Sequence, residues 1–355
     1  MKKHNFYAGP AILPAPVIKE AAEAALEIEN SGLSILEISH RSPTFVKILD
    51  EAEALVRELF NVGPDYKVMF LTGGASSQFY MSAMNLLSSN ETVGFLDTGT
   101  WSTKSIKEAK HFGNVKILAS SSDKNYNYIP KGFEIPSDSK YLHLTSNNTI
   151  FGTQIHEWPE TDVPFVCDMS SDIFSRPIDI NKYSLIYAGA QKNTGPAGVT
   201  LAIVKEDLLG KTDRAIPTML DYRTHIAKNS SFNTPPVFPI YVSMLTLRWL
   251  KGLGGISKME QMNIEKAGIL YDEIDRNPLF KGAAAKEDRS LMNVTFVMED
   301  DSMNDAFAAM AAEAGCVGIK GHRSVGGFRA SIYNAMPKDS VKVLADVMKE
   351  FERKA

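Results

Sequence analysis

The sequence predicts an α/β fold, in which a large domain with a mostly parallel sheet is joined to a smaller α+β domain. Two features of the chain predict it. From about Val68 to Val204, short apolar runs rich in β-branched or aromatic residues alternate with helix-like segments, which is the order of a mostly parallel sheet. After about Asn277 the order changes to strand, helix, strand, strand, helix, which suits a separate, smaller unit.

The elements follow in order along the chain. A helix is expected over SPTFVKILDEAEALVRELF, with Ser42 as its N-cap and Pro43 at its first position. Strands are then expected in KVMFL, TVGFLD, VKILAS, YLHLTS, PFVCD, SLIYAGA and GVTLAIV. A helical pattern runs from about Pro239 to Asn277 and is interrupted at GLGG. The last part has strands in LMNVTFVM, CVGIKG and GFRASIY, and helices in DAFAAMAAEAG and SVKVLADVMKEFERK.

Length and composition exclude several classes of protein. A chain of 355 residues is long enough for two domains, and a net charge of -4 gives no basic stripe for a nucleic-acid partner. The only cysteines, Cys167 and Cys316, lie in apolar strand-like runs, so we expect reduced core residues in a cytoplasmic protein and no zinc site. No signal peptide is expected, and no segment approaches the roughly 20 apolar residues needed to span a membrane.

A glycine-rich turn, LTGGASSQF, joins an expected strand to an expected helix. Residues Gly73 to Ser77 should present free backbone N–H groups and the positive end of the helix to an anion such as phosphate. The turn lacks the lysine of a P-loop and the spacing of the dinucleotide fingerprint, which disfavours a nucleotide. A serine-capped glycine turn without any ligand remains the alternative.

A carboxylate and an amine follow two consecutive strands. Asp168 ends VPFVCD, and Lys192 follows 24 positions later at the end of SLIYAGAQK, so both should lie at the carboxyl-end edge of the sheet. Taken singly, a helix-capping aspartate and a solvated lysine are the alternatives. Together with the phosphate turn they meet the needs of pyridoxal phosphate: a Schiff-base lysine, a partner for the pyridinium nitrogen and a phosphate site. Trp101 could stack on the ring, although a core or interface aromatic is the commoner role.

Segments along nearly the whole chain carry a resemblance to a known family: NFYAGPAILP, EISHRS, GGASSQF, DMSSDIFSRPID, IYAGAQKNTGPAG, FNTPP and GHRSVGGFRASIYNAMP. In order and spacing they resemble the class V aminotransferases, and within them the phosphoserine aminotransferases. The resemblance implies an aspartate-aminotransferase-like (fold type I) architecture, with a large cofactor-binding domain over residues 16–250 and a small domain from residues 1–15 and 251–355. It also implies one pyridoxal phosphate per subunit and a homodimer whose active sites are shared across the interface.

The resemblance also assigns roles to individual residues. It makes Lys192 the catalytic residue that holds the cofactor, pairs Asp168 with the pyridine nitrogen, stacks Trp101 on the ring and places Thr149 at the phenolic oxygen. Many relatives have an arginine where this chain has Ser76, which leaves the contribution of that side chain open. Five residues are expected to bind the phosphate, the last two from the partner subunit: Ala75, Ser76, Gln191, Asn233 and Thr234.

Substrate recognition is expected to need two cationic sites, one for an α-carboxylate and one for a distal phosphate. Guanidinium groups suit both anions because they pair with them in a bidentate manner. The resemblance assigns the carboxylate to Arg329 and the phosphate to His322 and Arg323, with His40 and Arg41 reaching it from the other subunit. Considered singly, each arginine is more typical of a surface ion pair.

The implied reaction is reversible amino transfer between L-glutamate and 3-phosphohydroxypyruvate, giving 2-oxoglutarate and O-phospho-L-serine for serine biosynthesis by ping-pong kinetics. Use of the related substrate of vitamin B6 synthesis, which gives 4-phosphohydroxy-L-threonine, stays open. A cysteine desulfurase or other lyase of the same fold would need a nucleophilic cysteine on an exposed loop. A non-catalytic binding protein is disfavoured because Lys192, Asp168 and Arg329 are all present, and a nicotinamide-dependent dehydrogenase lacks its glycine fingerprint.

Overall fold

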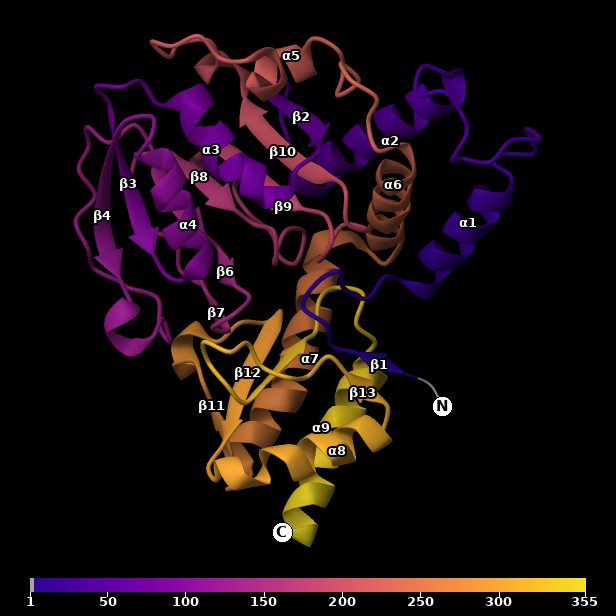
Figure 1. The fold of residues 1–355 in the computed structure, drawn as a ribbon, viewed down its shortest axis with the longest axis vertical. Coiled ribbons are helices and arrows are strands. Elements are labelled where there is room, and N and C mark those ends of the chain that lie inside the picture. The colour runs from indigo at the N-terminus through magenta and orange to yellow at the C-terminus, as the bar shows by residue number, and fades with distance from the viewer. Residues whose placement is uncertain (1–2) are drawn as a thin grey trace.

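The computed structural model describes residues 3–355 and contains a large and a small layered unit (Figure 1). The large unit is built on a seven-stranded sheet in the order β2-β10-β9-β8-β5-β3-β4. Its strands are parallel to their neighbours except β10, which is antiparallel to both β2 and β9. The predicted mostly parallel sheet is thereby confirmed. The seven strands are β2 (Tyr66–Leu71), β3 (Thr92–Asp97), β4 (Asn114–Ser120), β5 (Leu142–Thr145), β8 (Phe165–Asp168), β9 (Tyr183–Gly189) and β10 (Thr200–Lys205).

Helices cover both faces of this sheet. Successive residues of β8 belong to different hydrophobic clusters: Val166 packs with the cluster that includes Phe79 of α3, and Cys167 with the cluster of α2 and α6. Burial on both faces explains why the strands read as continuous apolar runs. Ser42 accepts a hydrogen bond from Phe45 N and caps α2, as the sequence predicts. The helices of this unit are α1 (Ala15–Leu26), α2 (Pro43–Phe60), α3 (Gly74–Leu86), α4 (Thr100–Ala109), α5 (Tyr222–Ile226) and α6 (Val237–Gly252).

The small unit lies below the large one in Figure 1 and begins with α7 (Gly255–Arg276), which follows α6 after the predicted break at Gly254. An antiparallel sheet in the order β11-β12-β14 packs with α7, α8 and α9 around a third hydrophobic cluster. Phe6, near the N-terminus, belongs to that cluster. The division into residues 16–250 and 1–15 with 251–355 remains a proposal that this packing supports. The remaining elements are β11 (Phe280–Gly282), β12 (Asn293–Met298), α8 (Asn304–Glu313), β14 (Phe328–Ser331) and α9 (Lys338–Lys354).

Two short strand pairings were not expected from the sequence. The run CVGIKG forms only a two-residue strand, β13 (Cys316–Val317), which pairs in parallel with β1 (His4–Asn5), while Lys320 makes an isolated antiparallel bridge to Phe328. Directly after β5, a hairpin of β6 (Asn147–Asn148) and β7 (Thr153–Gln154) reaches towards the small unit. Short 3-10 helices occur at Ser122–Lys124, Ile180–Lys182, Glu206–Leu208, Thr218–Leu220, Lys286–Asp288 and Asp301–Met303. Within residues 3–355, no helix is both long and apolar enough to cross a membrane.

Candidate active site

The turn between β2 and α3 forms one end of the site. Gly73 precedes the helix with φ +93°, a left-handed conformation that favours glycine, and an added Cβ would lie 1.9 Å from Ser77 Oγ. No side chain caps the first turn of α3, so its backbone N–H groups remain to bind a ligand. Gly74, Ala75 and Ser76 line a cavity in front of them. This geometry suits a phosphate.

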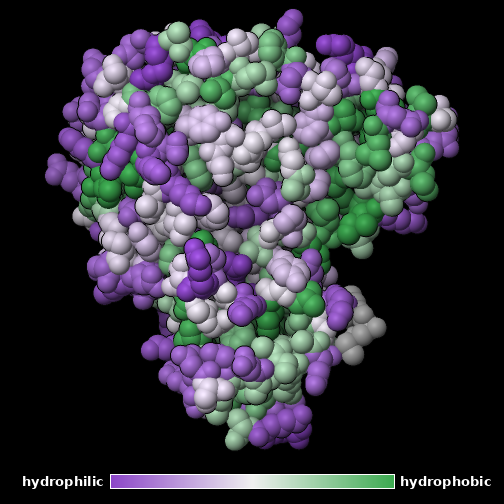
Figure 2. Space-filling view, viewed as in Figure 1, coloured by the Kyte–Doolittle hydropathy of each residue, from purple (hydrophilic) through white to green (hydrophobic). Residues whose placement is uncertain are grey.

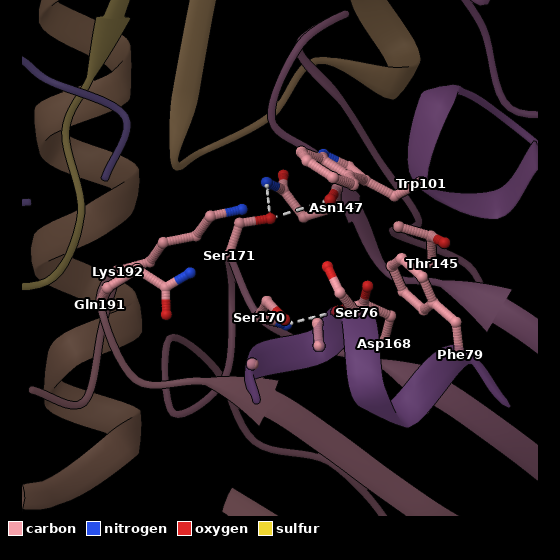
Figure 3. A pocket seen from close by; sticks show the side chains of 12 residues that line it. Ser76, Phe79, Trp101, Thr145, Asn147, Asp168, Ser170, Ser171, Gln191 and Lys192 are labelled. Atoms are coloured by element: carbon pink, nitrogen blue, oxygen red, sulfur yellow. Dashed lines mark hydrogen bonds between the residues drawn. The ribbon is translucent and has the colours of Figure 1, made fainter. Parts of the chain in front are cut away.

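The carboxylate lies where β8 ends. β8 and β9 are neighbouring parallel strands, as predicted, with Asp168 opposite Tyr187. The Asp168 side chain is 5% exposed, and its Oδ1 accepts a hydrogen bond of 2.9 Å from Ser170 N (Figure 3). Burial raises the pKa of Asp168, while hydrogen bonding from Ser170 and the charge of Lys192 oppose the rise. A cationic ligand group beside it would stabilise the ionised form.

The amine of Lys192 enters the same cavity from the turn after β9. Figure 3 shows the side chain extending towards Asn147 and Trp101. Its Nζ donates a hydrogen bond of 2.7 Å to Thr149 Oγ1 and lies 5.8 Å from the centre of the Trp101 ring. Burial lowers the pKa of Lys192 to about 8; the Asp168 carboxylate opposes this decrease and the Arg329 guanidinium adds to it. Near pH 8, about half of these amines are therefore neutral.

The cavity has an empty volume of about 530 Å³, part of it open to solvent. Two buried polar atoms at its wall, Trp101 Nε1 and Thr145 Oγ1, have no hydrogen-bond partner within the described residues. An amine, a buried carboxylate, an aromatic face and free helix N–H groups around one cavity fit pyridoxal phosphate. The cavity is lined by Gly74, Ala75, Ser76, Phe79, Trp101, Thr145, Asn147, Asp168, Ser170, Ser171, Gln191 and Lys192.

The expected substrate cations of the small unit lie near this cavity. Arg329, in β14, donates a 3.4 Å hydrogen bond from Nη1 to Thr149 O, and its buried Nε has no partner in the described part of the chain. Burial lowers the pKa of Arg329. His322 is partly buried and Arg323 exposed. Burial lowers the pKa of His322, and the charges of Arg329 and Arg323 lower it further. The two guanidinium groups therefore act on His322 and disfavour its charged form.

Thr149, His322, Arg323 and Arg329 do not line the cavity themselves, and four further expected site residues lie in other segments of the large unit. Arg41, Asn233 and Thr234 are exposed and His40 is partly buried, and none of the four lines the cavity of their own chain. His40 and Arg41 lie in the segment between α1 and α2, and Asn233 and Thr234 in the segment before α6. Their expected contribution to a partner's site stays a prediction.

Sequence reasoning missed several cavity residues, namely Phe79, Thr145, Asn147, Ser170 and Ser171. Asn147 Nδ2 donates a 2.8 Å hydrogen bond to Ser171 Oγ (Figure 3). A usable signal was present, because Thr145 ends β5 as Asp168 ends β8, and Asn147 follows β5 as Ser170 and Ser171 follow β8. Polar residues just after adjacent parallel strands meet at one edge of the sheet.

The fold and this site define a class of enzyme. Residues 3–344 match the family model "Aminotransferase class-V", and the chain belongs to that family of pyridoxal-phosphate-dependent transaminases. Along its full length it is 59% identical to the phosphoserine aminotransferase of Flavobacterium psychrophilum, with all of both chains covered. The protein of that name from Parabacteroides distasonis is 61% identical, with 99% of both chains covered.

Solved structures give the same relationship. Phosphoserine aminotransferase from Bacillus circulans subsp. alkalophilus has a TM-score of 0.96 at 43% identity, with 99% of both chains covered. The pyridoxal-phosphate-bound enzyme of that name from Trichomonas vaginalis has a TM-score of 0.93 at 34% identity, covering 98% of this chain and 100% of the other. The aspartate-aminotransferase-like fold expected from the sequence is thereby confirmed.

Proposed function

We propose that this enzyme transfers an amino group reversibly between L-glutamate and 3-phosphohydroxypyruvate, giving 2-oxoglutarate and O-phospho-L-serine for serine biosynthesis in the cytoplasm. The full-length similarity to phosphoserine aminotransferases supports this reaction. One arrangement supports the specificity: Lys192 Nζ and Arg329 Nη1 both donate to Thr149, at 2.7 Å to its Oγ1 and at 3.4 Å to its backbone oxygen, so the amine and the guanidinium lie close together. A substrate with an anion at each end can therefore be held while its α-carbon lies near the amine.

The residues that would hold the cofactor follow from the cavity. Backbone N–H groups of Ala75 and Ser76 would bind its phosphate, with Gln191 nearby, and Trp101 would pack against the ring face, since all four line the cavity. Asp168 would keep the ring nitrogen protonated, because a buried carboxylate is stabilised by a cation beside it. When bound, pyridoxal phosphate supplies an electron sink that stabilises negative charge at the α-carbon of the substrate.

Two side chains act at the reacting atoms. Lys192 would hold the cofactor through Nζ, and its free amine would move a proton at the substrate α-carbon as general base and then as general acid. Its pKa of about 8 provides neutral amine near neutral pH. Thr149 Oγ1, 2.7 Å from Lys192 Nζ, would provide the hydrogen bond to the phenolic oxygen.

Substrate anions are assigned to the small unit. Arg329 binds the α-carboxylate, and its unpartnered Nε leaves a donor free for this purpose. His322 and Arg323 bind the distal group, which is the side-chain carboxylate of glutamate in one half-reaction and the phosphate in the other. Histidine suits this dual role because it contributes either a charge or a neutral hydrogen bond.

We also propose a homodimer that completes the site. Large apolar side chains remain exposed at the end of α1 and in the segment that follows it: Leu26 is 84% exposed, Leu36 67% and Leu33 47%. Figure 2 shows a hydrophobic surface on the right of the molecule, over α1 and α2. His40 and Arg41 lie in the same segment, so a partner covering it would receive them at its own active site. A monomer that is fully active in dilute solution by sedimentation would refute this assembly.

The experiment that tests the reaction is optical and chemical. Protein supplied with pyridoxal phosphate should absorb in the visible range, glutamate should shift that absorption, and adding 3-phosphohydroxypyruvate should yield O-phospho-L-serine. The absence of a visible band after cofactor addition would reject the proposal. The same assay with the phosphorylated substrate of vitamin B6 synthesis decides between one substrate and two.

A cysteine-dependent lyase of the same fold finds no support in the two thiols. Cys167 and Cys316 are both buried. Burial raises the pKa of Cys316 to about 11 and that of Cys167 well above its usual value. A thiol that stays protonated at neutral pH and lacks access to substrate is a poor nucleophile.

A further inference from the structure

The hairpin β6–β7 carries Thr149 and is docked onto the small unit. Ser290 N donates to Gly152 O at 2.9 Å, and Thr295 Oγ1 donates to Phe151 O at 3.0 Å. Gly152 has φ +74°, and a Cβ at that position would lie 2.2 Å from Thr295 Oγ1. The hairpin backbone therefore lies directly against β12. The position of the Thr149 hydroxyl consequently depends on a contact made by the small unit.

Asn293, the first residue of β12, is at the centre of this contact. Its side chain is completely buried. Its Oδ1 accepts a 2.8 Å hydrogen bond from Asn147 Nδ2, and its Nδ2 donates to Ser331 Oγ at 2.9 Å and to Tyr333 OH at 3.2 Å. The carboxamide thus joins β14 to the first residue of β6. Because this amide is buried, loss of one of its partners leaves a polar group unpaired.

Asn147 transmits this contact to the active site. It lies two residues before Thr149, lines the cofactor cavity and donates to Ser171 Oγ at 2.8 Å. Ser290 Oγ, also from the small unit, donates to Asn147 Oδ1 at 2.5 Å. Asn147 is therefore bonded both to Ser171 of the large unit and to Ser290 and Asn293 of the small unit. A shift of Asn147 would move the hairpin, and with it the Thr149 hydroxyl, relative to Lys192.

We propose that Asn293 is a positioning residue for amino transfer: by holding Asn147, it keeps Thr149 Oγ1 against Lys192 Nζ and thus against the cofactor's phenolic oxygen. This inference rests on the proposed function, in which Thr149 and Lys192 act at the bound cofactor. A displacement of about 1 Å at such a group costs up to about a hundredfold in rate. No other side chain among the described residues bonds both Asn147 and β14.

The backbone position of Arg329 does not depend on the Asn293 side chain. Arg329 lies opposite Thr295 in the backbone pairing of β12 with β14, and that pairing continues from Asn293 to Phe296. Removing the carboxamide should leave this ladder intact. Removing the Asn293 carboxamide should therefore lower kcat, whereas KM for glutamate, which reports on binding by Arg329, should change little.

The first test compares two buried asparagines in the holoenzyme. Asn293→Ala should lower kcat by at least about tenfold, with KM for glutamate within about threefold. It should also raise the pH midpoint of the visible absorption, because a hydroxyl hydrogen bond to the phenolic oxygen favours the deprotonated chromophore. The matched control is Asn277→Ala. Asn277 is 1% exposed and donates to Glu273 Oε1 at 2.9 Å and to Met348 O at 3.2 Å, away from the hairpin. The control should lose stability but keep kcat and the midpoint.

The second test is a double-mutant cycle with Thr149→Val. If Asn293 acts through the Thr149 hydroxyl, Asn293→Ala should reduce kcat by less than about twofold in the Thr149→Val background. Independent, multiplying losses would overturn the proposal, as would equal losses in Asn277→Ala or an Asn293→Ala enzyme that resembles the wild type. If Asn293→Ala does not fold, Asn293→Ser replaces it, since a serine hydroxyl is too short to reach Asn147; the same outcomes then decide.

These outcomes are distinct from a failure of the proposed function. Wild-type enzyme that makes no O-phospho-L-serine rejects the proposed substrate. The pH titration of the visible absorption needs no turnover, so it still decides whether Asn293 positions Thr149.

Discussion

Replacing Lys192 by methionine removes an amine whose charged form is destabilised by burial in the folded protein. Burial lowers the pKa of this amine from 10.5 to about 8. Between these two values the unfolded chain binds the proton more strongly than the folded chain, so stability rises with pH in that window. Below pH 8 the folded chain must carry a charged, partly buried amine, which costs about 3 kcal/mol. That cost decreases as pH rises, to about 1 kcal/mol at pH 9.5.

The assay is urea unfolding of cofactor-free protein at pH 7 and pH 9.5, with all chains at one concentration. Lys192→Met should be more stable relative to wild type at pH 7 than at pH 9.5, and the difference between the two pH values should be about 2 kcal/mol. Lys182→Met, at an exposed position, is the control and should show no such trend.

A stability difference between Lys192→Met and wild type that is equal at pH 7 and 9.5 would refute the reasoning. The amine would then not titrate near pH 8, and the argument that neutral Lys192 is available as a base near neutral pH would lose its support. A difference that grows with pH would mean that the sign is wrong and that a nearby anion, not burial, dominates.

Three further predictions follow from the same geometry. Asp168→Asn removes the negative charge that raises the pKa of Lys192, so this pKa should fall below about 8. We expect kcat to fall by about a hundredfold, and an unchanged pH profile of kcat would contradict this prediction. Arg329→Ala should raise KM for both substrates, whereas His322→Ala should affect the phosphorylated substrate more than glutamate; equal effects of both variants would argue against two anion sites. Gly152→Ala should lower the free energy of unfolding by about 1–3 kcal/mol, because Gly152 has a φ of +74° and an added Cβ would lie 2.2 Å from Thr295 Oγ1. The measurement is Tm, and an unchanged Tm would show that the hairpin is not tightly docked.

Local patterns were enough to predict most elements of this fold. Ser42 and Pro43 predicted the start of α2, and the break at GLGG predicted the separation of α6 from α7. These features depend on capping, on backbone freedom and on apolar spacing within a few residues. The neighbourhood of Asp168 and Lys192 was also predictable, because consecutive parallel strands tend to be adjacent.

Contacts between distant segments could not be predicted in this way. CVGIKG has the apolar character of a strand, yet it divides between two partners: Cys316 and Val317 pair with the N-terminal β1, and Lys320 makes a single bridge to Phe328. Asn147 and Asn293 are 146 positions apart, and nothing in TSNN or LMNV indicates that their carboxamides meet. Such pairings depend on how complete layers pack, which no local pattern encodes.

The sequence by itself determined the alternating elements, the glycine turn before α3 and the order of Asp168 and Lys192 along the chain. Only the tertiary structure decided that Lys192 would be an amine of lowered pKa with its Nζ against Thr149, and that the small unit would hold that threonine in place. The physical reason is that charge and hydroxyl placement depend on desolvation and on hydrogen bonds between segments remote in the chain, and both arise only when the two units pack together.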